Sequence, residues 1–286
     1  MASSSIPVLS LLFVTLVWGA TFPVLKIATA QLSGVEVSAL RFMLAALCML
    51  PWALRAPRRA WIDGALLGAL VLFSYVAQAY GLQFISSNRS AFLTSLNVLM
   101  VPLIGMLLGN MLSWRVVLAA LLACFGIGLM SWDGGANLAA DAATVASATA
   151  YALYVILLSA RAARHEARSL AATQIVWMAL LGALWMLADA QGTDRLQTLG
   201  SRLNAEILWG LAYLGIVATA GMLFLQARAQ AHVSADKAAL IYAMEPVFAA
   251  LFAWVWLSEG LSPRSALGAG VVVFAVVFSE WQPAKR

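Results

Sequence analysis

The sequence predicts an all-α membrane protein with ten transmembrane helices, and three observations lead to this fold class. Of the 286 residues, 63% are hydrophobic and only 10% are charged, with a mean hydropathy of +0.91. A soluble domain carries about a quarter charged residues, so this composition indicates a lipid environment. Ten apolar stretches approach the length of about 20 residues that a spanning helix needs. The connections between them are short, and no soluble domain fits between the spans.

The ten predicted spans follow one another along the chain. They cover residues 6–30, 34–54, 61–84, 89–109, 114–132, 141–160, 169–188, 206–228, 235–257 and 264–281. The longest connection, 189–206, is polar and is expected at the membrane surface. No basic residue precedes the first span, and its apolar run is longer than the apolar region of a signal peptide, so a retained helix is predicted rather than a signal peptide.

The Lys and Arg residues of the loops predict the orientation, because they are in excess on the cytoplasmic side. With the N-terminus inside, the inner loops and the tail hold Arg55, Arg58, Arg59, Arg115, Arg161, Arg164, Arg168, Arg228, Lys237, Lys285 and Arg286. The outer loops then hold only Arg89, Arg195, Arg202 and Arg264. Both termini are therefore predicted to be cytoplasmic, in a bacterial inner membrane. The net charge of +5 follows from this loop pattern, and nothing in it indicates nucleic-acid binding.

A weak internal repeat relates the two halves of the chain. Gly109–Ser113 aligns with Ser258–Ser262, 149 residues later. Earlier in each half, an offset of 133 residues aligns Trp18 with Tyr151 and Arg41 with Gln174.

This repeat predicts two units, residues 1–133 and 134–286, each with five helices. Because five is odd, two such units in tandem enter the membrane from opposite faces and are inverted relative to each other. Inverted repeats place a binding site near the midplane at their junction, and rocking of one half against the other gives alternating access.

Motifs in four of the spans carry a family resemblance. They are Trp18–Lys26, Arg41–Ala46, Ala91–Pro102, and Glu245–Leu251 followed by Leu257–Glu259. Together these segments resemble the EamA family of the drug/metabolite transporter superfamily, over essentially the whole chain. The resemblance implies ten helices, two inverted five-helix repeats and the export of small metabolites or drugs. Length and aromatic content are similar to the amino-acid exporters of the YddG type.

One position departs from this symmetry. The first half has Leu96-Asn97 where the second half has Glu245-Pro246. A role of the Glu-Pro pair therefore cannot be carried over to both halves.

Glu245 is the only carboxylate near the middle of a predicted span. A charge in hydrocarbon is costly, so this residue needs a partner or a purpose. It is either a proton or cation site, or a packing residue beside the kink expected at Pro246. Kinks are also predicted at Pro23 and Pro102, where they suit helices that bend during gating.

Lys26 and Arg41 are expected toward the outer ends of the first two spans, with Glu36 in the loop between them. The interpretation that we favour is an interface cluster whose long side chains snorkel to the surface. The functional alternative is recognition of a substrate carboxylate, because cations in a partly dry vestibule attract anions strongly.

Polar and aromatic side chains on shared helix faces predict a substrate cavity. Several pairs of these side chains are three residues apart, so the two members of each pair share one face of their helix. In the first span a stripe of side chains at intervals of four, which continues to Lys26, also lies on one helix face. If these faces converge, they enclose an aromatic cavity with a few polar anchors, as is typical of small-ligand sites. Hydrogen bonding between helices and ordinary core packing are the alternatives. The predicted cavity residues are Trp18, Phe22, Tyr75, Gln78, Thr94, Asn97, Gln174, Trp177, Tyr242 and Glu245.

Missing motifs argue against an enzyme. The chain has no G-x-x-x-x-G-K-[ST] and no G-x-S-x-G, and His165-Glu166 lacks the second histidine of a zinc-protease motif. Cys48 and Cys124 have no metal-ligand spacing. No catalytic residue, cofactor or metal is therefore predicted. The expected partners are a small-molecule substrate and the lipid bilayer, and ten helices suffice for a monomer to enclose a path.

The predicted function is secondary transport that exports small organic metabolites, above all neutral or aromatic amino acids, through a central cavity by alternating access. One alternative is a multidrug or organic-cation exporter, in which Glu245 attracts the cation. A second alternative is a membrane scaffold that transports nothing. Proton antiport and facilitated diffusion are both compatible with the sequence.

Overall fold

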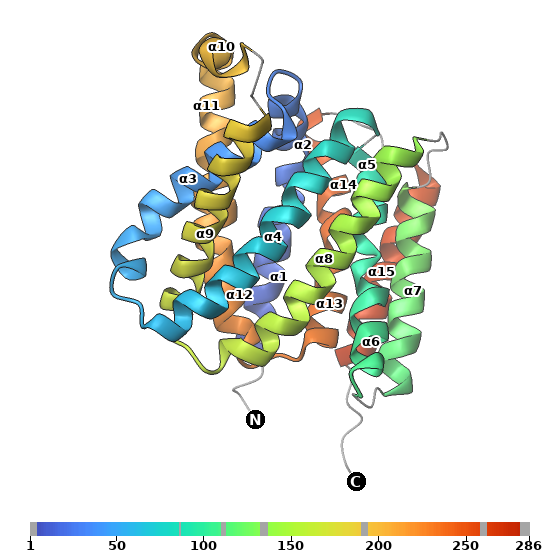
Figure 1. Ribbon diagram of the computed structural model, residues 1–286. Coiled ribbons are helices and arrows are strands. Elements are labelled where there is room, and N and C mark those ends of the chain that lie inside the picture. Colours follow the sequence, from blue (N-terminus) through green and yellow to red (C-terminus); the bar gives the residue numbers. More distant parts are fainter. Residues whose placement is uncertain are drawn as a thin grey trace.

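The chain folds into a bundle of helices in the computed structural model (Figure 1), which describes residues 5–85, 87–109, 113–131, 137–189, 194–257 and 262–280. The helices are α1 (Ser5–Gly19), α2 (Thr21–Thr29), α3 (Gly34–Ala53), α4 (Arg58–Phe84), α5 (Ser87–Ser95), α6 (Asn97–Leu107), α7 (Trp114–Ser131), α8 (Leu138–Ala162), α9 (Ala167–Asp189), α10 (Arg195–Arg202), α11 (Ala205–Ala212), the π-helix η1 (Tyr213–Gly221), α12 (Met222–Gln230), α13 (Ala235–Tyr242), α14 (Glu245–Leu257) and α15 (Pro263–Glu280). No strand occurs in these described ranges.

Seven helical segments of the described chain are long and apolar enough to cross a membrane. They are Ser5–Thr29, Gly34–Ala53, Arg58–Phe84, Arg89–Leu107, Leu138–Ala162, Ala167–Asp189 and Ala205–Gln230. Two shorter apolar helices, Trp114–Leu129 and Pro263–Phe278, correspond to the fifth and tenth predicted spans. The ninth, 235–257, is divided into α13 and α14. An all-α protein with several membrane spans is confirmed, while ten spans in inverted halves stay a prediction.

Small residues bring the helices together. α3 packs along α9, α7 packs along α15, and α4 contacts both α8 and α9. A Cβ on Gly64 of α4 would lie only 2.5 Å from Oγ1 of Thr173 in α9, and one on Gly126 of α7 would lie 2.7 Å from the carbonyl oxygen of Gly268 in α15. Such close approach gives membrane helices the van der Waals contact that lipid cannot replace.

Two of the three prolines at which kinks were predicted explain helix breaks. A proline ring clashes with the carbonyl four residues earlier. α1 ends at Gly19, four residues before Pro23, and α13 ends at Tyr242, four residues before Pro246. The break at Leu96 between α5 and α6 lies six residues before Pro102, which sits inside α6, so this proline does not cause it. A gating role for these kinks stays a prediction.

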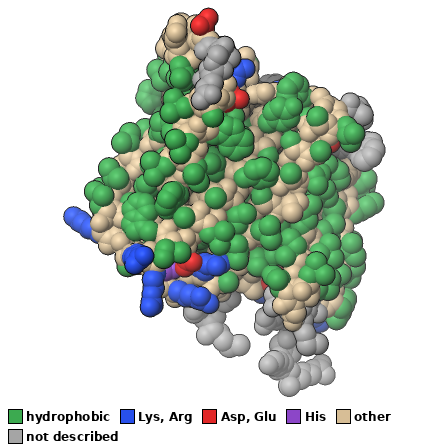
Figure 2. Space-filling model, viewed as in Figure 1, with side chains coloured by type: hydrophobic (Ala, Val, Ile, Leu, Met, Phe, Trp, Pro, Cys, Tyr) green, Lys and Arg blue, Asp and Glu red, His purple; other side chains and the backbone are tan. Residues whose placement is uncertain are grey.

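Both ends of the bundle carry ion pairs. α1 begins and α15 ends at the same end, opposite α10 (Figure 1). Figure 2 shows Lys and Arg side chains gathered at that end, below a mostly hydrophobic face. There Asp63 accepts from Nε of Arg161 and contacts Nε2 of His165, both at 2.7 Å. Near α10, Arg202 donates to both carboxylate oxygens of Glu36, at 2.6 and 2.8 Å.

Candidate functional site

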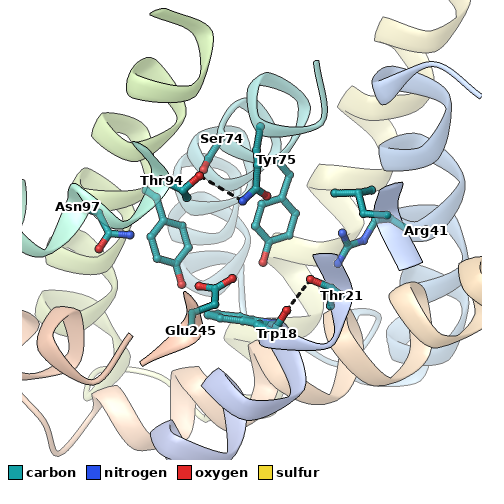
Figure 3. Close-up of a pocket in the computed structure, with 11 residues that line it drawn as sticks. Trp18, Thr21, Arg41, Ser74, Tyr75, Thr94, Asn97 and Glu245 are labelled. Atoms are coloured by element: carbon teal, nitrogen blue, oxygen red, sulfur yellow. Dashed lines mark hydrogen bonds between the residues drawn. The ribbon is translucent and has the colours of Figure 1, made fainter. Parts of the chain in front are cut away.

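A polar cavity lies between helices from both halves of the chain (Figure 3). Its free space is about 480 Å³, part of which is open to the outside. The lining side chains come from α1 to α6 on one side and from α8 and α14 on the other. They are Trp18, Thr21, Leu25, Arg41, Ser74, Tyr75, Gln78, Thr94, Asn97, Tyr151 and Glu245.

Arg41 brings a buried cation to the cavity. Its side chain is only 6% exposed, and its Nε and Nη2 donate to Oγ1 of Thr219 at 3.1 and 2.9 Å. The guanidinium also lies against the rings of Tyr75 and Phe42, 5.0 and 5.5 Å from their centroids. Within the described residues no carboxylate pairs with it. A full positive charge therefore remains available to a ligand.

Glu245 brings a carboxyl group to the cavity. It is the first residue of α14 and is half-buried, with its side chain in the cavity lining. Other carboxylates of the bundle have arginine partners, as Glu36, Asp63 and Asp141 show. Across the described part of the chain, Glu245 has neither an ion pair nor a side-chain hydrogen bond. Figure 3 places it apart from Arg41, so the cavity holds a guanidinium and a carboxyl group that do not pair with each other.

Neutral polar groups line another part of the cavity. Nε2 of Gln78 donates to Oγ1 of Thr94 at 3.4 Å, and this hydroxyl donates in turn to the carbonyl of Ser90 at 2.7 Å. Asn97 lies beside Thr94, where the break at Leu96 separates α5 from α6. These groups can hydrogen-bond a ligand without adding charge.

Contacts outside the cavity fix the position of Trp18, which forms part of the aromatic lining. The ring of Trp18 lies edge-on to Tyr151 at 6.1 Å and tilted against Tyr242 at 5.7 Å. Nε1 of Trp18 donates to the carbonyl of Ala218 at 2.9 Å. Because the indole N–H is already bonded, the exposed part of this side chain offers the cavity an apolar face.

Behind this lining lies a network of buried polar side chains, which we call the Gln226 network. Oε1 of Gln226 accepts from the hydroxyl of Tyr154 at 3.0 Å, and its Nε2 donates to the hydroxyls of Tyr151 and Tyr242 at 3.1 and 3.0 Å. The hydroxyl of Tyr242 then donates to Oε1 of Gln230 at 3.1 Å. Every polar atom of the Gln226 amide therefore has a partner.

The structure brings most of the predicted cavity residues together. Those that line the cavity are Trp18, Tyr75, Gln78, Thr94, Asn97 and Glu245, together with Arg41. Four others do not line it. Phe22 is buried elsewhere, Tyr242 belongs to the Gln226 network, Trp177 donates from Nε1 to the carbonyl of Trp61 at 3.1 Å, and the fully buried Gln174 has no partner for its amide among the described residues.

Two interpretations of charged residues need correction. Arg41 is not a snorkelling interface residue, because it lies inside the bundle and faces the cavity. Glu36 does not cluster with Arg41 or Lys26, because its carboxylate binds Arg202. Lys26 is exposed and donates to the carbonyl of Leu82 at 2.9 Å, near the end of α4, so it does not face the cavity.

Thr21, Leu25, Ser74 and Tyr151 line the cavity without having been predicted. Tyr151 could have been found, because the repeat aligns it with Trp18. Thr21 and Leu25 lie three and seven residues after Trp18, whereas the predicted stripe continued at intervals of four. Positions three and seven residues after Trp18 share its helix face, so a wider stripe than the one with intervals of four would have included both residues.

The fold and the site define a class, a multi-pass membrane protein with a polar cavity between its helices. The model of the EamA-like transporter family matches residues 5–132 and again residues 138–281. The chain therefore belongs to this family and is a membrane transporter.

Two relatives agree with this assignment, and a solved structure shares the fold. Two uncharacterized transporters of Archaeoglobus fulgidus are 28% and 23% identical to the chain. The alignments cover 94% and 91% of this chain and 84% and 93% of theirs. A crystal structure with 18% identity superposes with a TM-score of 0.77 and covers 96% of this chain and 97% of its own, which shows the shared fold.

Proposed function

We propose that the protein is a secondary transporter that exports small zwitterionic metabolites, neutral and aromatic amino acids above all, through the cavity by alternating access. The observation that carries this proposal is the presence of Arg41 and Glu245 in one cavity, without a salt bridge between them. A neutral amino acid has one carboxylate and one ammonium group. It would supply both the guanidinium and the carboxyl group with the partners that the protein itself does not provide.

The remaining lining suits the side chain of such a substrate. Trp18, Tyr75 and Tyr151 present aromatic surface, and Leu25 adds an aliphatic contact. Pockets for small ligands combine apolar and aromatic walls with a few placed polar groups. An aromatic substrate side chain would gain stacking contacts on these rings.

The position of the cavity supports the transport cycle. Its lining comes from residues 18–97 and from residues 151 and 245, so both proposed five-helix halves contribute. The family model matches each half separately, in agreement with a duplicated unit. In transporters built from inverted repeats, one half rocks against the other around a site at their interface. The gathering of Lys and Arg at one end of the bundle supports a cytoplasmic location for both termini (Figure 2).

Flux into liposomes that contain the purified protein tests the proposal. We expect protein-dependent counterflow of labelled phenylalanine and leucine, and we expect Arg41→Gln to lower it about 100-fold. Arg58→Gln, which removes an exposed charge at the start of α4, is the matched control and should transport normally. Absence of flux for all twenty amino acids would contradict the proposal, and absence for cations as well would favour a scaffold.

An organic-cation exporter is the second candidate, and the unpaired carboxylate of Glu245 favours it. A cation in the cavity would bind this carboxylate and stack on the aromatic wall. The two candidates differ in their need for Arg41. A cation exporter should tolerate Arg41→Gln and lose all transport with Glu245→Gln.

A further inference from the structure

The membrane segment Ala205–Gln230, formed by α11, η1 and α12, contacts side chains of the cavity lining from outside the cavity. None of the lining residues belongs to this segment. Two consecutive residues of η1 nevertheless bond two lining residues. The carbonyl of Ala218 accepts from Trp18, and Oγ1 of Thr219 accepts from Arg41 twice. The segment therefore orients both an aromatic wall and the cation of the site.

The π-helical turn gives the Thr219 hydroxyl its direction. This hydroxyl donates to the carbonyl of Leu214, five residues earlier, at 2.7 Å. In an α-helix a threonine bonds the carbonyl four residues back, whereas a π-helix has the i, i+5 spacing. With its single proton used on Leu214, Oγ1 of Thr219 can only accept from Arg41.

A glycine brings η1 close enough to α3 for this contact. A Cβ on Gly215 would lie 2.8 Å from the carbonyl oxygen of Arg41 and 3.1 Å from Cβ of Leu44. The two backbones are therefore nearly in contact at this point. Thr219 follows about one turn later and reaches the guanidinium from the same side.

A neutral partner leaves the charge of Arg41 intact. A carboxylate in place of Thr219 would neutralise the guanidinium, whereas a hydroxyl fixes its orientation and leaves its net charge unchanged. Nε and Nη2 are bonded to Thr219, and Nη1 has no bond to any described residue. The fixed guanidinium can then meet a carboxylate at Nη1 without losing further side-chain entropy.

We propose that Thr219, oriented by the π-helix η1, positions Arg41 for the substrate carboxylate and thereby makes the transporter select carboxylate-bearing solutes. Thr219 acts through Arg41 and is a positioning residue. The inference rests on the proposed function, because it assumes that Arg41 binds the substrate. It adds that a segment outside the cavity lining sets the selectivity.

Kinetics of Thr219 variants in proteoliposomes test the inference. Thr219→Val keeps the shape of the side chain and removes the acceptor. We expect it to raise the KM for phenylalanine about tenfold, because the substitution removes the shared acceptor that orients the guanidinium. The kcat should stay unchanged, because the bond positions a binding group. Thr219→Ser keeps the hydroxyl and should behave like the wild type.

An inhibitor without a carboxylate shows whether Thr219 positions Arg41 or only packs the helices. Phenylalaninamide has the ammonium group but no carboxylate, so its inhibition constant should be the same for the wild type and Thr219→Val. If Thr219→Val weakens the acid and the amide equally, Thr219 only packs the helices and the inference fails. Thr219→Ala, with the same two readouts, serves if the valine variant does not fold.

Transport by the Arg41→Gln variant distinguishes failure of this inference from failure of the proposed function. If the wild type transports no amino acid, the proposed function is wrong. If the wild type transports phenylalanine and Arg41→Gln leaves this transport unchanged, Arg41 does not bind the substrate and the present inference fails with it. If Arg41→Gln lowers transport but Thr219→Val has wild-type kinetics, only the present inference is wrong. Where residual transport by Arg41→Gln is measurable, adding Thr219→Val should have no further effect, because the two residues act together.

Discussion

The cavity and the Gln226 network are adjacent polar regions of the bundle, and they differ in how their polar atoms are satisfied. Tyr151 belongs to both. In the network, the amide of Gln226 uses both of its N–H groups and its oxygen on three tyrosine hydroxyls. In the cavity, Arg41 has only a hydroxyl and two aromatic rings for its charge, and Glu245 has no bonded partner in the described chain.

This difference teaches how to separate structural from functional polar residues in a membrane protein. Polar groups in hydrocarbon are costly unless they are paired. A network with every atom paired stabilises the helix arrangement by itself. Charges kept apart in a cavity lower the stability of the empty protein and retain affinity for a ligand. Mutations in the Gln226 network should therefore lower the stability of the protein, and mutations in the cavity should lower its transport activity.

The largest effect is expected for Arg41→Gln. It should lower kcat/KM for phenylalanine about 100-fold, because a hydrogen bond from a buried cation to a carboxylate contributes up to about 3 kcal/mol. The melting temperature in detergent should not fall, because the variant removes a buried charge that has no acidic partner. If Arg41→Gln melts at a lower temperature but transports normally, Arg41 stabilises the fold and does not serve transport.

The next effect concerns stability. Gln226→Leu removes the partner of three tyrosine hydroxyls, and unsatisfied buried groups of this kind cost about 2 kcal/mol in total when neighbours relax. The melting temperature should fall by about 5 °C, measured by tryptophan fluorescence in detergent.

Gln174→Leu is the matched control for this variant. Gln174 is equally buried, but neither atom of its amide has a partner in the described chain. The same substitution should therefore leave the melting temperature unchanged or raise it. Equal losses at the two positions would show that the hydrogen bonds of the Gln226 network contribute nothing.

Glu245→Gln has a smaller expected effect on transport. The glutamine can still hydrogen-bond an ammonium group but has lost its charge, so the KM for phenylalanine should rise about tenfold. Glu166→Gln, at an exposed position between α8 and α9, is the control. Unchanged amino-acid transport combined with lost transport of organic cations would instead support the cation exporter.

Trp18→Phe should have the smallest effect. The substitution keeps an aromatic ring beside Tyr151 and Tyr242 and removes the hydrogen bond to Ala218. Loss of one neutral hydrogen bond should raise the KM about threefold. Trp61→Phe, which changes a ring outside the cavity lining, should leave the KM unaltered. A larger effect at Trp61 would mean that the cavity is not the transport site.

Helical periodicity predicted the parts of the site that lie within one regular helix. Tyr75 and Gln78 share a face of α4, and both line the cavity. The reasoning also held across the break at Leu96, because Thr94 and Asn97 both line the cavity, but it failed for Gln174 and Trp177 within α9 and at the break between α13 and α14. The break at residues 243–244 separates Tyr242 from Glu245. In the first span Thr21 lines the cavity and Phe22 does not, although both positions are neighbours of Trp18 on the helix surface.

Contacts between distant helices could not be predicted from one sequence. Arg41 meets Thr219 across 178 residues, and Gln226 meets Tyr151 across 75. Nothing in local propensity indicates a π-helix at Tyr213–Gly221, so the direction of Thr219 could not be foreseen. The spans themselves were predictable, because about 20 apolar residues have few stable arrangements other than a membrane helix.

Competition by single-charge analogues tests most directly whether the two separated charges bind a zwitterion. The measurement is inhibition of phenylalanine counterflow by phenylalaninamide, which lacks the carboxylate, and by 3-phenylpropionate, which lacks the ammonium group. If Arg41 and Glu245 each bind one end of the substrate, both analogues should inhibit at least about tenfold more weakly than phenylalanine. Equal inhibition by phenylalanine and either analogue would show that one of the two charges has no part in recognition.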